Sequence, residues 1–169
     1  MPLIVHEVST SIPPDILLEV LTDFERYPEM FSMVQETRIE HSGPPVWEVY
    51  FKSYVIRTFD YRLRLEVRTE TTSEEETLSE LRWSLIDGFF VHNNGRWQLL
   101  TRGETTILRY ELTMQLATFL PQSVRRTLTG TLLTETFDSI LSRSTALLEE
   151  RALLKAAAET SQRIGPIDG

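Results

Sequence analysis

Residues 59–68 read Phe-Asp-Tyr-Arg-Leu-Arg-Leu-Glu-Val-Arg, and this stretch decides the fold. Apolar or aromatic side chains alternate with charged ones at every position. A period of two places the two sets on opposite faces of an extended strand, so the run predicts a strand with one dry face and one wet face. Such half-buried strands are typical of antiparallel sheets.

The same alternation recurs on both sides of this stretch, in residues 47–51, 81–85 and 108–116. Gly, Pro, Asp and Ser clusters separate these runs and predict reversals of the chain. No connection between them is long enough to hold a crossover helix. Consecutive strands are therefore expected to be hairpin neighbours in one antiparallel sheet.

A first strand is expected over residues 2–11, because this segment is rich in β-branched residues and ends before Pro13 and Pro14. A short helix over residues 15–21 follows, with an apolar stripe along one face. Pro28 ends or bends the chain after it, and a second short helical piece carries Met30 and Phe31 into the core.

Pro121 begins a long C-terminal helix that is expected to run to about Ala158, with a bend or a separate short helix near Gly130. This helix is the only large amphipathic cover for the dry face of the sheet. The fold class is therefore α+β: a curved antiparallel sheet of about seven strands around a C-terminal helix, with two short helices after the first strand. Residues 1–158 form one domain, and residues 159–169 are expected to be a flexible tail.

The chain has 169 residues and carries a net charge of −8, and its first 45 residues contain eight acidic and two basic side chains. No basic stripe is present to follow a phosphate backbone, which disfavours direct binding of nucleic acid. There are no cysteines, so a disulfide framework and thiolate metal sites are excluded. The N-terminus does not read as a signal peptide and no apolar run is long enough for a membrane span, so we expect a cytoplasmic protein.

Two short motifs carry a resemblance to a known family. Residues 23–28, Asp-Phe-Glu-Arg-Tyr-Pro, match a D-x-x-x-Y-P pattern. Residues 83–90, Trp-Ser-Leu-Ile-Asp-Gly-Phe-Phe, followed by Gly95 and Trp97, match an S-L-x-D-G-x-F stretch and a G-x-W. In this order and spacing the chain resembles the coenzyme Q-binding START-like family. The resemblance covers roughly residues 1–150. That family belongs to the polyketide cyclase/dehydrase and lipid transport superfamily (SRPBCC).

The resemblance implies a helix-grip fold, as in START-like and Bet v-like proteins, with a hydrophobic cavity between the sheet and the C-terminal helix. The resemblance does not choose the ligand. The leading hypothesis is binding or transport of a quinone, lipid or polyketide-like molecule, without catalysis. Two other functions remain open: a regulator that binds the ribosome or another protein, like one branch of the family, and a polyketide aromatase or cyclase. A protein partner or a homodimer is compatible with any of these.

The candidate ligand-binding residues are those whose apolar or aromatic side chains are expected to point inward, since aromatic walls suit a flat ring. They are Trp47, Phe51, Phe59, Tyr61, Leu65, Trp83, Trp97, Tyr110, Leu112 and Phe137. Residues expected at the cavity mouth or in its lid are Tyr27, Pro28, Met30 and Phe31. For each single residue, simple filling of the core is the competing interpretation. Tyr61 and Tyr110 stand out because a buried phenol needs a hydrogen-bond partner, which a bound carbonyl could provide.

No catalytic group and no cofactor is expected from the sequence. The three histidines, His6, His41 and His92, are isolated and lack the spacing of metal ligands. Glu135 would be the best candidate for a general acid or base if the helix turned it inward, but a solvated position is the ordinary expectation.

Overall fold

The computed structural model describes residues 3–116, 119 and 121–164. Pro2, expected to begin the first strand, and the tail from Gly165 lie outside the described residues. The strands are β1 (Leu3–Thr10), β2 (Val34–Gly43), β3 (Val46–Tyr54), β4 (Thr58–Ser73), β5 (Glu76–Gly88), β6 (Phe90–Arg102) and β7 (Thr105–Leu116). The helices are α1 (Pro14–Thr22), the 3-10 turn η1 (Phe24–Arg26), α2 (Tyr27–Met30), α3 (Gln122–Thr129) and α4 (Thr131–Ile164).

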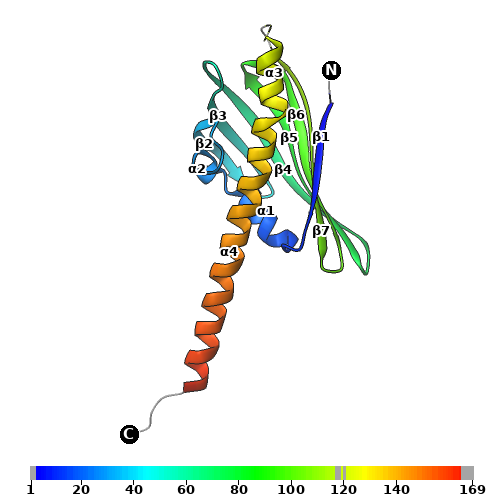
Figure 1. The fold of residues 1–169 in the computed structure, drawn as a ribbon, viewed down its shortest axis with the longest axis vertical. Helices are drawn as coiled ribbons and strands as arrows, with labels where there is room; N and C mark the ends of the chain where they lie inside the picture. Colours follow the sequence, from blue (N-terminus) through cyan, green and yellow to red (C-terminus); the bar gives the residue numbers. More distant parts are fainter. Residues whose placement is uncertain (1–2, 117–118, 120, 165–169) are drawn as a thin grey trace.

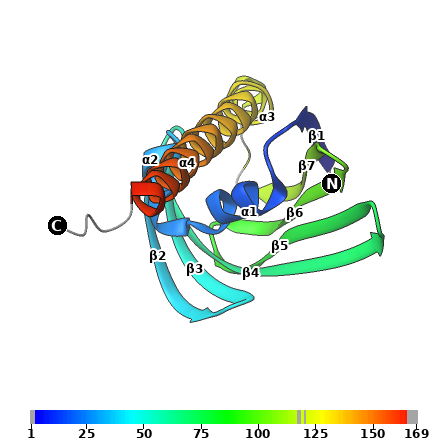
Figure 2. The same ribbon diagram turned by 90° about the horizontal axis from the view of Figure 1, so that it is seen from below.

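The seven strands form one antiparallel sheet in the order β1-β7-β6-β5-β4-β3-β2. Strands β2 to β7 are hairpin neighbours, as the short connections predicted, and β1 closes the far edge beside β7. The sheet curls around α1, and α3 and α4 lie across its open side (Figures 1 and 2). The fold class expected from the sequence is confirmed.

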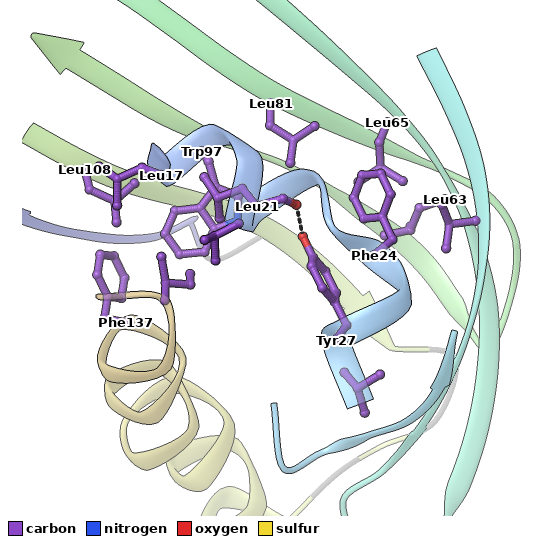
Figure 3. Close-up of a cluster of buried hydrophobic side chains, with 14 of the residues drawn as sticks. Leu17, Leu21, Phe24, Tyr27, Leu63, Leu65, Leu81, Trp97, Leu108 and Phe137 are labelled. Atoms are coloured by element: carbon purple, nitrogen blue, oxygen red, sulfur yellow. Dashed lines mark hydrogen bonds between the residues drawn. The ribbon is translucent and has the colours of Figure 1, made fainter. Parts of the chain in front are cut away.

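The core lies between the concave face of the sheet and the helices. Helix α1 contributes Ile16, Leu17, Val20 and Leu21, all buried, on the stripe that its sequence predicted. Phe24 follows on η1 and is fully buried. Figure 3 shows Leu17, Leu21 and Phe24 converging with side chains from the sheet and from α4, namely Leu63, Leu65, Leu81, Leu108 and Phe137.

The C-terminal helix is divided as the glycine predicted, because α3 ends at Thr129, Gly130 caps it, and α4 starts at Thr131. Helix α4 buries Phe137, Ile140 and Ser144 against the core. It then continues to Ile164, six residues beyond the end expected at Ala158. This last part projects past the sheet (Figure 1), and every described side chain in residues 148–162 is exposed. Alanine and charged residues favour helix without packing, and no Gly or Pro interrupts them before residue 165.

The convex face of the sheet carries a network of ion pairs across the strands. Glu80 is only 9% exposed and accepts hydrogen bonds from Arg82, Arg96 and Gln98. Arg96 also donates to Glu111, at 2.6 Å between Nε and Oε2. Opposite charges on neighbouring strands stabilise the wet face of a sheet in this way.

Candidate functional site: an apolar cavity under the C-terminal helix

A cavity of about 190 Å³ lies between the concave face of the sheet and the first turns of α4. Every strand contributes to its wall, together with α2, the segment after it and α4. The lining residues are Ile4, Tyr27, Phe31, Met33, Val34, Phe51, Tyr61, Leu63, Leu65, Leu81, Trp83, Phe90, Asn93, Trp97, Tyr110, Leu112, Met114, Leu132, Leu133 and Thr136. The wall is therefore almost entirely apolar or aromatic.

Nine of the residues expected at the site line this cavity. They are the inward-facing Phe51, Tyr61, Leu65, Trp83, Trp97, Tyr110 and Leu112, and the lid residues Tyr27 and Phe31. Residues from the two sequence motifs thus meet at one site, since Tyr27 belongs to the first motif and Trp83 and Trp97 belong to the second.

Three expected residues pack elsewhere in the core instead. Trp47 meets Phe24 edge-on, with ring centroids 5.6 Å apart. Phe59 stacks on Phe89 at 4.9 Å, nearer the β3–β4 connection. Phe137 packs edge-on against Trp97, at 5.2 Å, and against His6, at 4.7 Å. Each shares the dry face but packs against other core side chains and does not line the cavity.

Pro28 and Met30, expected at the mouth, do not line the cavity itself. Met30 lies in a neighbouring hollow of about 330 Å³ between the α2–β2 connection and α4. This hollow shares Phe31, Met33, Leu132 and Thr136 with the cavity, so the two spaces adjoin. The hydroxyl of Ser32 donates to Glu135 across it, at 3.1 Å.

Sequence reasoning missed several wall residues. Leu63, Leu81 and Met114 belong to the alternating runs, so their inward direction was available from the pattern. Met33, Asn93 and Thr136 carried no such signal, because their position depends on how the connection and α4 settle over the sheet.

Six of the lining residues carry polar groups, and five of them have partners. The hydroxyl of Thr136 donates to the carbonyl oxygen of Leu132. The hydroxyl of Tyr27 donates to the carbonyl oxygen of Leu21 (Figure 3). The hydroxyls of Tyr61 and Ser53 lie 3.4 Å apart. The indole Nε1 of Trp83 donates to Oδ1 of Asn93 at 3.0 Å.

Tyr110 is the exception, because its hydroxyl forms no hydrogen bond within the described part of the chain. Its ring packs against Trp97 at 4.6 Å and leaves the hydroxyl in the cavity wall. Burial raises the pKa of Tyr110 well above its ordinary value, and burial likewise raises the pKa of Tyr27 and of Tyr61. All three phenols are therefore neutral donors at physiological pH.

The described wall of the cavity has no carboxylate, histidine or lysine. Glu135 is exposed on α4 and accepts the hydrogen bond from Ser32, so it does not turn inward. Among the described residues, no three His, Asp or Glu side chains are grouped so that they could hold a metal ion. The arrangement can desolvate an apolar molecule and orient one polar group, mainly through Tyr110.

Comparison with known proteins agrees with this geometry. Residues 10–139 match the family model described as polyketide cyclase/dehydrase and lipid transport. A comparison with curated proteins finds no significant match.

Solved structures share the fold at low sequence identity. A protein of Thermus thermophilus is 20% identical with a TM-score of 0.62, covering 91% of this chain and 99% of that one. A START superfamily protein of Mycobacterium smegmatis is 16% identical with a TM-score of 0.65, covering 86% and 98%. An aromatase/cyclase of a Streptomyces species is 17% identical with a TM-score of 0.61, covering 89% and 95%. With its helix-grip fold, its apolar cavity and a family match over most of its length, this chain belongs to the polyketide cyclase/dehydrase and lipid transport family.

Proposed function

We propose that this protein binds a hydrophobic small molecule with one polar end, and that the hydroxyl of Tyr110 donates a hydrogen bond to that end. The observation that carries the proposal is an apolar cavity with one phenol that has no protein partner among the described residues. A phenol that opens onto an apolar cavity and has no protein partner is free to donate to a ligand carbonyl.

The size of the cavity favours a compact ring as the buried part of the ligand. Its volume of about 190 Å³ is below the ~300–1000 Å³ of common ligand pockets. A longer apolar chain would extend into the adjoining hollow beside Met33 and Thr136. Each buried methylene contributes about 0.8 kcal/mol, so a chain of this kind supplies affinity without further polar contacts.

A quinone is the first ligand to test, because the motifs at residues 23–28 and 83–97 resemble the coenzyme Q-binding family. A quinone ring would present a carbonyl to Tyr110, with Phe51, Tyr61 and Trp97 as aromatic walls. Fatty acids and polyketide-like molecules are the other ligands to include. The absence of cysteine fits a cytoplasmic location, which belongs to the same proposal.

We favour binding without catalysis over an aromatase or cyclase activity. The similarity of the fold to an aromatase/cyclase structure favours the catalytic alternative. Dehydration and cyclisation require a positioned acid or base. The described cavity wall offers tyrosines as its titratable groups, and their raised pKa values keep them protonated at neutral pH, so they supply no base and only a weak acid.

The test is native mass spectrometry of protein purified from its own host, followed by solvent extraction of whatever is bound. We expect a co-purifying hydrophobic molecule that raises the unfolding temperature when it is added back. Protein that emerges empty, and that no quinone, fatty acid or polyketide stabilises, would contradict the proposal. Side chains would then be the natural occupants of the space.

Two threonines on α4 provide a matched pair for this experiment. Thr136 lines the cavity, whereas Thr134 is exposed, and each donates its hydroxyl to the carbonyl four residues earlier. Thr136→Phe should fill the cavity and abolish ligand binding. Thr134→Phe loses an equivalent hydrogen bond and should bind normally. Equal binding by both variants would place the ligand elsewhere.

A further inference from the structure

The β3–β4 connection and the β5–β6 connection meet at one end of the molecule, beside α3 (Figure 1). A hollow of about 60 Å³ joins them, since Ile56, Phe89 and Val124 line it from the two connections and from α3. We call this end the apical surface and define it by Tyr54, Ile56, Arg57, Phe89, Val91, Phe119, Arg125 and Arg126.

Large apolar side chains are exposed across this surface. Phe119 is 85% exposed, Ile56 57%, Tyr54 49% and Val91 47%. Tyr54 ends β3, Val91 lies at the start of β6, Ile56 lies in the β3–β4 connection, and Phe119 precedes α3. Clustered exposure of this kind, unlike single exposed residues, marks an interaction site.

The charge of the apical surface is opposite to that of the protein. The chain carries a net charge of −8, yet residues 54–59, 88–95 and 112–134 contain three arginines and neither Asp nor Glu. The bordering acids are already engaged: Asp60 accepts a hydrogen bond from Tyr50, and Asp87 pairs with Arg62.

The arginines are held against aromatic rings at this surface. The guanidinium of Arg57 lies 4.9 Å from the ring centroid of Phe89, and that of Arg125 lies 5.3 Å from the ring of Phe119. Arg57 and Arg126 form no ion pair with any described residue, whereas Arg62, Arg82, Arg96 and Arg109 on the convex face all do. Cationic heads beside apolar rings suit the boundary between lipid headgroups and acyl chains.

We propose that the apical surface docks on an anionic phospholipid bilayer. The exposed apolar side chains would enter the interface, and Arg57, Arg125 and Arg126 would meet the lipid phosphates. The remaining acidic surface would be repelled by the same bilayer, so the charge asymmetry orients the protein with this end toward the lipid. This is peripheral binding: no helix in the described part of the chain combines the length and apolar character that crossing a bilayer requires.

The docking surface connects with the cavity. The apical hollow and the cavity share Met33, Phe90 and Met114, so an apolar wall runs from the lipid-facing end to the ligand site. Methionine side chains adapt their shape easily, which favours passage at this point. Docking itself does not depend on the cavity's being occupied.

The test is co-sedimentation of the full chain with vesicles. Wild-type protein should pellet with vesicles of equal parts phosphatidylcholine and phosphatidylglycerol, and should stay in solution with phosphatidylcholine alone. Added salt should weaken the binding. Ile56→Glu and Arg126→Glu should each reduce the affinity by about five-fold or more, since one charge near the surface contributes about 1 kcal/mol.

Matched controls lie on the projecting part of α4. Leu153 is 72% exposed and Lys155 is exposed, so Leu153→Glu and Lys155→Glu make the same chemical changes away from the apical surface. Both should bind vesicles like wild type. If the controls lose as much vesicle binding as Ile56→Glu does, the proposal is overturned, because the total charge of the protein would then explain the effect.

Two other outcomes would also overturn it. One is equal binding to neutral and anionic vesicles, and the other is no vesicle binding together with Arg126-dependent binding of an acidic protein. Thr136→Phe separates this inference from the ligand proposal, because a blocked cavity should leave vesicle binding unchanged. Failure of ligand binding with intact docking would therefore count against the cavity proposal alone.

Discussion

Trp83 and Gly95 face each other as the last pair of the β5–β6 ladder, and the indole of Trp83 occupies the space that a side chain at residue 95 would need. Beyond this pair the two strands separate, and asparagine side chains replace part of the ladder. Asn93 accepts the indole N–H, and Asn94 accepts the amide of Leu85 at 3.3 Å. Trp83 lines the cavity on one side and a polar hollow on the convex face on the other. The indole therefore closes the sheet where its ladder ends.

Gly95→Ala should destabilise the protein strongly. A Cβ at residue 95 would lie 2.3 Å from Cζ2 of Trp83 and 2.4 Å from the backbone oxygen of Glu111. The ring or the strand must shift, and such overpacking costs about 1–3 kcal/mol. Thermal unfolding measures the loss. Gly43→Ala is the control, because its closest contact would be 3.4 Å. Similar unfolding temperatures for the two variants would show that Trp83 moves freely, so that it does not close the sheet.

The alternating runs predicted the sheet and which face of each strand is dry, because a period of two leaves only one consistent arrangement. They did not predict where along the dry face the cavity lies. Phe51 and Trp47 alternate in the same run, yet Phe51 lines the cavity and Trp47 packs on Phe24. That difference arises from the curl of the sheet and the seating of α1. Both are tertiary properties that no local pattern encodes. The position of Thr136 in the cavity wall could not be predicted for the same reason, since it depends on how α4 lies over the sheet.

Tyr110→Phe should weaken ligand binding and leave the fold intact. Its hydroxyl has no protein partner among the described residues, so removing it should change the free energy of unfolding by less than about 0.5 kcal/mol. Loss of one hydrogen bond to a ligand carbonyl should reduce the affinity by about ten-fold. A ligand titration of purified protein measures this. Tyr50→Phe is the control, since Tyr50 lies on the convex face and bonds Asp60. Unchanged affinity in Tyr110→Phe would remove Tyr110 from the site.

Replacing Arg96 should make the protein more sensitive to acid. Hydrogen bonds from Arg96 and then Arg109 hold the pKa of Glu111 below its ordinary value of 4.5. A carboxylate with a lowered pKa in the folded state stabilises the protein above its unfolded pKa, and this contribution disappears as the pH falls through the folded pKa. In Arg96→Gln the pKa of Glu111 should rise, and acid unfolding followed by circular dichroism should begin at higher pH. Arg102→Gln breaks only the more exposed pair with Glu76 and should shift the transition little.

The buried tyrosines should make the protein unstable in alkali. Burial raises the pKa of Tyr27, Tyr61 and Tyr110 above their ordinary value of 10.0. Above that pH the unfolded chain loses these protons while the folded chain keeps them. Stability is therefore fully present below pH 10.0 and declines as the pH rises toward the folded pKa values.

Tyr27→Phe tests this explanation, because it should have opposite effects in two pH ranges. At neutral pH it removes the hydrogen bond to Leu21 and should cost about 0.5–1.5 kcal/mol. In alkali it removes one group that ionises only on unfolding, so its stability should decline less steeply than that of wild type. Unfolding temperatures measured across both ranges show the two slopes. Parallel curves for the variant and wild type would mean that Tyr27 ionises in the folded protein, and its hydroxyl would then be open to solvent.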